Sequence, residues 1–336
     1  SYFIFGGTGF IGTHLSSLLH EVHPETRIYN LDIVEPGTPL PTVKNYKPAL
    51  GKGEEHAATF IYCDVRQPIE LEKVNITPDD VIFNFAAVHR TPGHPDPAYF
   101  ETNIRGAENV CAFAERHGIR KIVFTSSIAP YGAAEELKEE TTLPMPNTPY
   151  GISKLVAEKI HQTWQAGGEG RQLTIVRPGV VFGRGENGNF TRLYWGIRGH
   201  KFMYPGRKDT IKACIYVKEL VRFMLYRLEH HDSGVELYNC CYEPAYTIEH
   251  IVESMKRVTN MKVKVPFMPG WLIMTAAGIA GALGSPMGIC PARVRKLQIS
   301  TNICGKKLSA SGYRFRYTFE EALADWYKDN GNLYLQ

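Results

Sequence analysis

Residues 2–12 read Tyr2-Phe3-Ile4-Phe5-Gly6-Gly7-Thr8-Gly9-Phe10-Ile11-Gly12, and this stretch decides the fold. Its apolar start predicts a buried strand, and Gly6, Gly9 and Gly12 follow at regular three-residue intervals. A turn without Cβ atoms lets the backbone approach a pyrophosphate, which then sits on the N-terminus of the next helix. Gly12 lets that helix pack closely on the strand. The stretch therefore predicts a dinucleotide site.

An acid at the end of the next strand strengthens this prediction. Residues 27–31 predict the second strand, and Asp32 follows it, 20 residues beyond Gly12. A carboxylate there accepts hydrogen bonds from the hydroxyls of the adenosine ribose and repels a 2′-phosphate. Ile33 and Val34 come next, so no adjacent arginine offers a phosphate contact. We therefore expect NAD rather than NADP.

Strand-like and helix-like segments alternate through the first half of the chain. We predict strands at 2–5, 27–31, 59–63, 81–85, 121–125 and 173–176, and a helix with one apolar stripe between residues 97 and 117. Such alternation indicates an α/β fold with a Rossmann-type doubly wound parallel sheet. After residue 178 the alternation ends. We predict an NAD-binding domain over 1–178 and a smaller, partly interleaved C-terminal substrate domain over 179–330.

Composition excludes several classes of protein. The 336 residues carry a net charge of only +4, with acids and bases interspersed, which does not indicate a nucleic-acid binder. The seven cysteines include no Cys-x-x-Cys pair, so we expect no metal site, no disulfide framework and a reducing, cytoplasmic compartment. The apolar stretch 270–284 is shorter than the roughly 20 residues of a transmembrane helix. It favours a buried or substrate-covering helix over one lying on a membrane surface.

Tyr150 and Lys154 are four residues apart, so on a helix both point the same way. A phenol is a poor base at neutral pH, but a fixed ammonium beside it stabilises the phenolate. Tyr150 can then exchange a proton with a hydroxyl while hydride moves to or from a nicotinamide. An isolated pair of this kind is more often a surface feature; beside a dinucleotide site the catalytic interpretation is favoured.

The glycine spacing, with Thr8 and the pair Phe10 and Ile11, resembles the extended short-chain dehydrogenases/reductases, the NAD-dependent epimerase/dehydratase family. The resemblance implies further cofactor-side residues in the family's order: Asp64 and Val65 at the adenine, Phe85, Ala86, Ala87 and His89 at the nicotinamide, Asn103 on the following helix, Lys154 on the nicotinamide ribose, and Pro178. It also implies a homodimer formed through the helices that hold Asn103 and Tyr150.

Ser127 stands where the family places the hydroxyl that hydrogen-bonds the reacting oxygen, which completes a triad with Tyr150 and Lys154. An N-cap serine is the plain structural alternative. Family members that are sugar 4,6-dehydratases carry an Asp-Glu pair at the next two positions. Ile128 and Ala129 stand there in this chain, so water elimination would lack its acid and base. We therefore do not expect a dehydratase.

The substrate side is read from scattered polar residues. Val180 replaces the asparagine that nucleotide-sugar epimerases often place near the pyrophosphate. Polar and cationic candidates for a nucleotide sugar remain: His89, Arg90, Ser127, Asn187, Asn189, Arg207 and Lys212. The same cations can equally form a solvated face, which is the interpretation we favour for Lys208.

The function expected is NAD-dependent C4 epimerisation of a UDP-sugar through a 4-keto intermediate. The main alternative is a nucleotide-sugar 4-keto reductase of surface-polysaccharide synthesis, which the region around 291–296 resembles. Asp32 favours the epimerase, because NAD is mostly oxidised in cells and suits a cycle that consumes no reductant. Two outside alternatives are an enzyme resembling 3β-hydroxysteroid dehydrogenase and a non-catalytic NAD-binding protein.

Overall fold

The computed structural model describes residues 1–38, 58–89, 93–232, 234–272, 275 and 298–336. Its main element is a seven-stranded sheet in the order β12-β7-β5-β4-β1-β2-β3, in which every pairing is parallel. The strands are β1 (Tyr2–Phe5), β2 (Ile28–Asp32), β3 (Thr59–Tyr62), β4 (Val81–Asn84), β5 (Lys121–Thr125), β7 (Gln172–Pro178) and β12 (Val235–Cys240). The predicted doubly wound parallel sheet is confirmed.

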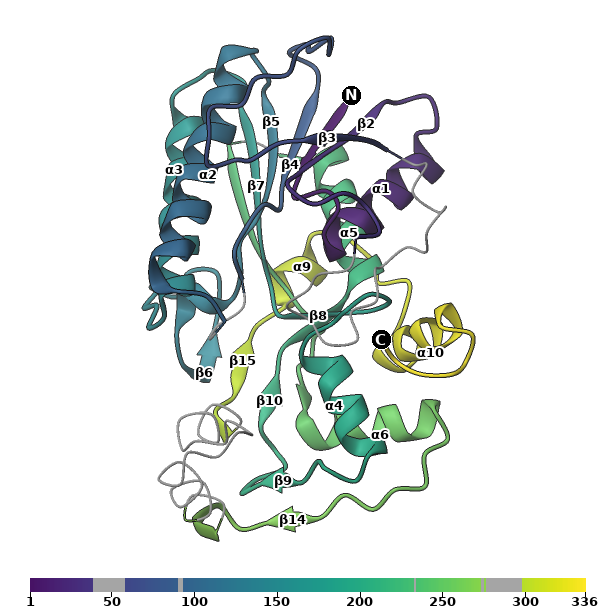
Figure 1. The fold of residues 1–336 in the computed structure, drawn as a ribbon. Helices are drawn as coiled ribbons and strands as arrows, with labels where there is room; N and C mark the ends of the chain where they lie inside the picture. Colours follow the sequence, from purple (N-terminus) through teal and green to yellow (C-terminus); the bar gives the residue numbers. More distant parts are fainter. Residues whose placement is uncertain (39–57, 90–92, 233, 273–274, 276–297) are drawn as a thin grey trace.

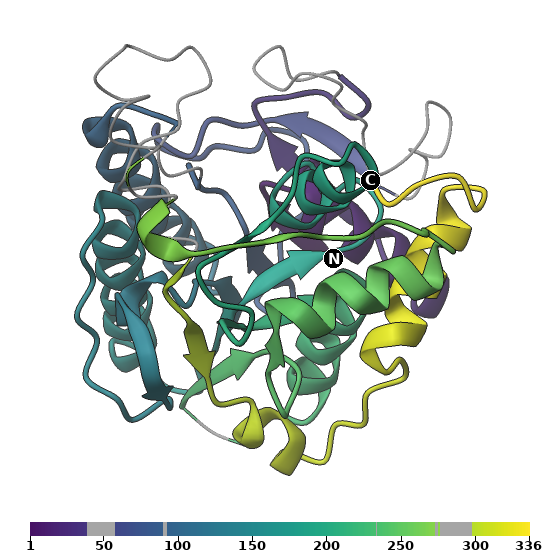
Figure 2. The ribbon, with the colours of Figure 1, turned by 90° about the horizontal axis from the view of Figure 1, so that it is seen from below.

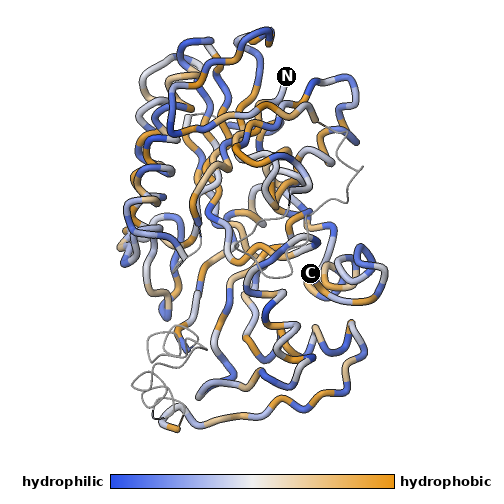
Figure 3. Tube along the Cα trace, in the orientation of Figure 1, coloured by the Kyte–Doolittle hydropathy of each residue, from blue (hydrophilic) through white to orange (hydrophobic). Residues whose placement is uncertain are grey.

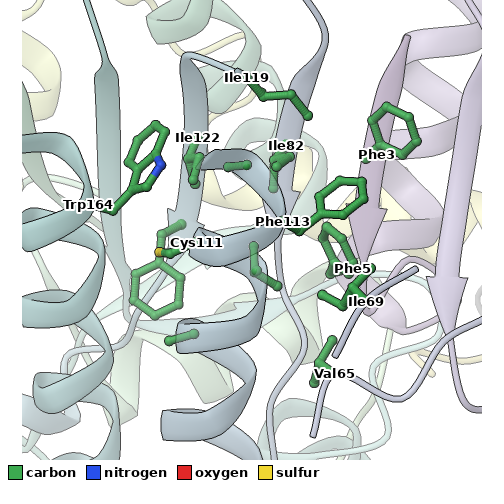
Figure 4. Packing of buried hydrophobic residues seen from close by; sticks show 14 of the residues in the cluster. Phe3, Phe5, Val65, Ile69, Ile82, Cys111, Phe113, Ile119, Ile122 and Trp164 are labelled. Carbon is green, nitrogen blue, oxygen red and sulfur yellow. The ribbon is translucent and has the colours of Figure 1, made fainter. Parts of the chain in front are cut away.

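Helices cover both faces of this sheet (Figure 1). On one side lie α2 (Asp96–Arg116) and α3 (Pro149–Ala166), and on the other lie α1 (Phe10–Val22) and α5 (Val217–Glu229). Figure 4 shows the first core, where Phe113 from α2 and Trp164 from α3 pack towards Phe3, Phe5 and Ile122 of the strands. Alternate side chains of the same strands enter a second core beneath α1 and α5.

Smaller sheets lie beyond the carboxyl ends of these strands (Figures 1 and 2). Three sheets are formed by β13 (Tyr246–Thr247), β10 (Ile211–Lys212), β15 (Thr301–Ile303) and β6 (Ala134–Lys138); by β8 (Val180–Phe182) and β11 (Cys214–Tyr216); and by β9 (Tyr204–Pro205) and β14 (Phe267–Met268). Around them lie α4 (Asn189–Arg198), α6 (Ile248–Val258), α9 (Lys306–Ala310), α10 (Phe319–Asp329) and the 3₁₀ turn η2 (Ala129–Tyr131). An aromatic core centred on Phe182, Phe319 and Trp326 holds this part together.

Two elements from beyond residue 178 belong to the large sheet. β12 pairs with β7 along its whole length, from Val235 opposite Leu173 to Cys240 opposite Pro178. α5 packs beside α1 and buries Leu220, Phe223 and Met224. The large sheet and its covering helices are therefore completed by residues after 178, the predicted domain boundary.

The predicted strands agree with the structure to within one or two residues at most ends, and the predicted helix at 97–117 is α2. Figure 3 shows apolar residues concentrated along the central strands and hydrophilic ones on the outer turns. Most of the apolar stretch 270–284 lies outside the described residues. Its first side chains, Trp271 and Leu272, are exposed, and the buried or substrate-covering helix expected here stays a prediction.

Neither a membrane span nor a metal cluster is found among the described residues. No helix there has both the length and the apolarity needed to cross a bilayer. Within the same ranges, no three His, Cys, Asp or Glu side chains are grouped so as to hold a metal ion. The six cysteines that the structure describes are buried and unpaired.

Candidate active site

The glycine turn between β1 and α1 is as tight as the sequence predicted. Gly6 has φ +75°, and a Cβ built there would lie 2.7 Å from the nitrogen of Ala86. A Cβ on Gly12 would lie 2.6 Å from the Cα of Gly7, so the third glycine does allow close packing of the helix. Gly9 differs, because its Cβ would meet only the carbonyl oxygen of Gly6, at 3.3 Å. Space beside Gly9 is therefore open at the start of α1.

The first turn of α1, with Phe10 and Ile11 behind Gly9, has no side-chain cap and no acidic residue. Its free N–H groups suit an anion such as a pyrophosphate. This open turn, together with the carboxylate at the end of β2, fits the NAD predicted from the sequence.

Asp32 at the end of β2 is oriented by the glycine turn itself. One carboxylate oxygen accepts a hydrogen bond from the Thr8 amide at 3.2 Å, and the other accepts one from the Ile33 amide at 2.8 Å. The Thr8 hydroxyl in turn donates to the carbonyl of Val34 at 2.9 Å. Burial raises the pKa of Asp32, while these hydrogen bonds oppose the rise. The part played by Thr8 was not predicted from the sequence.

Asp64 lies just beyond the end of β3 and accepts hydrogen bonds from Arg66, a contact that was not predicted from the sequence. Arg66 donates to it from Nε at 2.9 Å and from Nη2 at 2.6 Å, and these hydrogen bonds lower the pKa of Asp64. The adenine contact expected of Val65 stays a prediction, and the structure shows how Val65 is held in the fold. Its side chain lies in the core against α2, close to Gly106, and its carbonyl accepts a hydrogen bond from Asn109 at 2.8 Å.

The turn after β4 is fixed against the neighbouring elements. The Phe85 amide donates to the carbonyl of Phe5 at 2.8 Å, and Ala86 closely approaches Gly6. Ala87 follows, and His89 beyond it is exposed, whereas the candidate Arg90 lies outside the described residues.

Asn103 on α2 holds this turn from the other side. Its Oδ1 accepts from the Val88 amide at 2.8 Å, and its Nδ2 donates to the Val88 carbonyl at 3.1 Å and to Ser153 Oγ at 2.8 Å. The buried amide is thus engaged by protein groups on both ends. Asn103 therefore positions the turn against α3, and the cofactor contact that the resemblance implied stays a prediction.

The structure brings Ser127, Tyr150 and Lys154 together. Pro149 begins α3 and Thr148 caps it by accepting a hydrogen bond from the Gly151 amide at 3.1 Å, so Tyr150 and Lys154 project from its first turns. Ser127 lies beside Tyr150, close enough for its hydroxyl group to lower the pKa of the Tyr150 phenol.

The loop that carries Ser127 is tied to the end of β7. The Ile128 amide donates to the carbonyl of Pro178 at 3.3 Å. Pro178, predicted at the cofactor, thus supports the loop through its backbone. The Ala129 amide donates to Ser127 Oγ at 3.1 Å, which fixes the hydroxyl group within the loop.

Burial works against both ionisations that the chemistry needs. It raises the pKa of Tyr150 to about 12, although the nearby Ser127 hydroxyl opposes this rise. It lowers the pKa of Lys154 to about 7, although the nearby Glu158 opposes the fall. Lys154 Nζ lies 4.5 Å from the centroid of the Phe124 ring, in an apolar wall. In the protein alone, Tyr150 is therefore neutral near pH 7, and a positive charge brought close to it would favour its phenolate.

Comparison with known proteins now fixes the family. Residues 2–241 match the family model described as the NAD dependent epimerase/dehydratase family. The chain belongs to this family. The extended short-chain dehydrogenase type predicted from the sequence is therefore confirmed, and with it an NAD-dependent enzyme.

Similar proteins cover almost the whole chain. N-acetyl-alpha-D-glucosaminyl-diphospho-ditrans,octacis-undecaprenol 4-epimerase of Escherichia coli O157:H7 is 31% identical over 328 residues, which span 95% of this chain and 92% of that protein. A 3-beta-hydroxysteroid dehydrogenase of Mycolicibacterium neoaurum is 24% identical, over 95% and 88% of the two chains. A solved UDP-N-acetylglucosamine 4-epimerase from Methanobrevibacter ruminantium M1, in complex with UDP-N-acetylmuramic acid, has a TM-score of 0.74 at 21% identity and covers 99% and 98%.

The polar candidates on the substrate side are mostly engaged by protein groups. Asn187 donates to the Gly185 carbonyl at 2.9 Å and accepts from Gln336 at 3.3 Å. Asn189 begins α4 and accepts from Arg192 at 3.0 Å on the surface. Neither arrangement by itself marks a sugar site, so both assignments stay predictions.

The cations expected at a substrate pyrophosphate are also paired. Arg207 Nε lies 2.8 Å from Asp209, and its Nη1 lies 3.1 Å from Glu135 on β6. Lys212 on β10 donates to the carbonyl of Ile299 at 2.7 Å. Because two carboxylates neutralise Arg207, the structure presents it as a link between β6 and its own loop. Lys208, expected on a solvated face, pairs with the half-exposed Glu249 at 2.9 Å.

Proposed function

We propose that this protein interconverts the 4-epimers of a hexose carried on a diphosphate, through a 4-keto sugar. The observation that carries the proposal is Ser127 beside Tyr150, with Lys154 one turn along α3, together with a glycine turn whose Thr8 amide donates to Asp32. The apolar Ile128 and Ala129 after Ser127 offer no acid or base for water elimination. The names of the 4-epimerases among the relatives support the same reaction.

Each residue of the triad has a definite task in this reaction. Tyr150 takes the proton of the sugar O4 hydroxyl and later returns it, while Ser127 hydrogen-bonds the same oxygen. Lys154 supplies the positive charge that favours the phenolate of Tyr150. The glycine turn and Asp32 would hold NAD, which when bound would supply the hydride acceptor and donor for C4. Proton and hydride leave and return in equal number, so the product differs from the substrate only at C4.

The carrier of the sugar is predicted to be UDP. A polyprenol is a second candidate, and an exposed apolar group favours it. Phe267 and Trp271 are 51% and 72% exposed, and Leu272 beside them is also exposed. A chain of isoprene units requires apolar surface near the diphosphate site, whereas a nucleotide does not. The name of the Escherichia coli relative, which specifies a sugar on diphospho-undecaprenol, supports this candidate.

One assay tests the reaction and the carrier together. The protein is incubated, without added reductant, with UDP-glucose, UDP-N-acetylglucosamine and N-acetylglucosaminyl-diphospho-undecaprenol in detergent. We expect conversion to the 4-epimer at constant mass with no net change in NADH absorbance, and the substrate that reacts identifies the carrier. Stoichiometric oxidation of NADH with a UDP-4-keto-6-deoxy sugar, and no epimerisation, would replace this proposal with the reductase.

Tyr150→Phe is the matched control for that assay. The variant should retain fold and NAD binding, since it loses one hydroxyl, but its turnover should fall by at least about 100-fold, the scale of a lost general acid–base. Turnover near that of the wild type would show that another group moves the proton.

We also propose that the protein is a homodimer in the cytoplasm, joined through α2 and α3. Ile152 and Val156 lie one turn apart on α3 and are exposed, an apolar pair that a second copy could cover. The buried, unpaired cysteines among the described residues suit a reducing compartment. Light scattering after gel filtration should give a dimer for the wild type and a monomer for Val156→Glu. A monomeric wild type contradicts the dimer.

A further inference from the structure

Glu158 lies on the same face of α3 as the catalytic pair. It follows Lys154 by one helical turn and Tyr150 by two, so the three side chains form one row. Glu158 is buried, and both of its oxygens are used by Arg177 of β7. Arg177 Nε donates to Oε1 at 2.8 Å, and Nη2 donates to Oε2 at 2.6 Å.

The same carboxylate holds the loop after β5. Ser126 donates its hydroxyl hydrogen bond to Glu158 Oε1, and Ser126 directly precedes the catalytic Ser127. The Ser126 amide also donates to the Val176 carbonyl of β7 at 2.8 Å. Glu158 therefore joins α3, which carries Tyr150, to the loop that carries Ser127.

Arg177 extends this connection beyond the loop. Its guanidinium lies 4.7 Å from the centroid of the Tyr131 ring in η2, and the Tyr131 hydroxyl donates to Asn239 of β12 at 2.8 Å. Both members of the ion pair are buried, with 3% of the Arg177 side chain and 1% of the Glu158 side chain exposed. Loss of the carboxylate would leave Arg177 and Lys154 as two buried cations without a shared anion.

The charge balance around Lys154 depends on this one acid. The groups that face it are Tyr150, Glu158 and His161 on its own helix and, through Glu158, Arg177 on β7. Burial lowers the pKa of His161 to about 4, so this ring is neutral at pH 7. Glu158 is the anion in this group, and it opposes the loss of the Lys154 proton.

We propose that Glu158 is a positioning residue for the reaction, which fixes the loop of Ser126 and Ser127 against α3 and keeps Lys154 charged beside Tyr150. The inference rests on the roles proposed above for Ser127, Tyr150 and Lys154.

The test compares Glu158→Gln, which keeps the shape of the side chain without its charge, with Glu158→Asp, which keeps the charge. Ionisation of Tyr150 is followed with NAD bound, as the phenolate absorbance of each protein minus that of the same protein carrying Tyr150→Phe. We expect the midpoint in Glu158→Gln to move to higher pH by about one unit, because a nearby opposite charge shifts a pKa by 1–3 units. Turnover at pH 7 should fall about tenfold. Glu158→Asp should restore the wild-type midpoint.

A matched ion pair elsewhere in the chain provides the control. Glu236 of β12 is buried and accepts from Arg227 of α5 at 2.6 and 3.0 Å, on elements that carry no triad residue. Glu236→Gln should lose stability and leave the Tyr150 midpoint unchanged. If Glu158→Gln also leaves that midpoint unchanged, Glu158 is only structural and the inference is overturned.

Two features keep this test decisive. The titration needs no sugar, so its outcome does not depend on whether the substrate and the reaction of the proposed function are correct. If Glu158→Gln does not fold, the double variant Glu158→Gln/Arg177→Met leaves no unpaired guanidinium and takes its place. The same upward shift of the midpoint is expected there, and an unchanged midpoint again overturns the inference.

Discussion

At the scale of single residues, Asp32 shows how neighbours prepare a side chain for its ligand. Amides of Thr8 and Ile33 hold its two oxygens in place before any cofactor arrives. The carboxylate is therefore fixed where the ribose hydroxyls of NAD would meet it. A 2′-phosphate at the same position would face a negative charge that cannot turn away.

Replacing Asp32 with Ala should narrow the preference for NAD over NADP. We expect the wild type to bind NAD at least about 100-fold more tightly, a difference of ~2.7 kcal/mol, and the variant to lose most of that gap. Calorimetric titration with both cofactors measures it. Asp64→Ala, an acid on the same edge of the sheet, is the control and should weaken both cofactors alike. Equal affinities in the wild type would contradict the assignment.

Lys154 should carry a stability cost that depends on pH. Its pKa is lowered from 10.5 to about 7, so between these values the unfolded chain binds more protons than the folded one, and stability rises with pH. Below pH 7 both states are protonated and the cost is complete, on the order of several kcal/mol at ~1.4 kcal/mol per unit. Lys154→Met removes the cost. The variant should be more stable than the wild type at pH 6, and its advantage in free energy of unfolding should be smaller at pH 9.

Urea unfolding of the protein without NAD, at both pH values, checks this prediction. Lys208→Met alters an exposed lysine, and its free energy of unfolding should differ from that of the wild type by the same small amount at each pH. A difference between Lys154→Met and the wild type that does not change with pH would show that Lys154 is not buried as the structure has it.

At the scale of elements, the turn between β1 and α1 separates two uses of glycine. Gly12 has no room for a methyl group, whereas Gly9 has φ −71° and a Cβ there would have one near neighbour, the Gly6 carbonyl oxygen at 3.3 Å. Gly12→Ala should therefore destabilise the protein by about 1–3 kcal/mol, as overpacking does. Gly9→Ala should fold with nearly unchanged stability but bind NAD at least about tenfold more weakly, because the methyl group occupies the space beside the helix N-terminus.

Thermal unfolding and NAD titration of the two variants decide between these expectations. An unchanged affinity in Gly9→Ala would place the pyrophosphate elsewhere.

How far the sequence could predict the molecule follows from the range of each interaction. The strands, the glycine turn and the Tyr150–Lys154 row depend on spacing within one element or between neighbours, and these were predicted. Pairs between distant positions were not. The contact of Arg207 with Glu135 was missed because nothing in the local sequence points to an acid 72 residues earlier. Glu158 and Arg177 were missed for the same reason, since only the fold places β7 beside α3.

At the scale of the whole molecule, the large sheet and its helices do not end at residue 178, where the alternation of strands and helices in the sequence stops. A chain of residues 1–178 would lack α5 and β12, and would leave the face formed by Ile4, Leu15 and Leu19 uncovered. We expect this fragment to bind a hydrophobic dye and to unfold without a cooperative transition. Coexpression with 179–336 should restore both cooperativity and NAD binding. A fragment that melts sharply on its own would instead make 1–178 an independent domain.

The late arrival of β12 also has a consequence during synthesis on the ribosome. Pro178 ends β7, but its pairing partner Cys240 is added 62 residues later. At about 5–20 residues per second, the free edge of β7 waits roughly 3–12 seconds for its neighbour. During that time a nascent chain carries an unpaired parallel strand, Gln172–Pro178, that could pair with another nascent chain. Slower elongation between these positions would lengthen this interval, so codon choice over 179–240 should affect the soluble yield more than codon choice after residue 240.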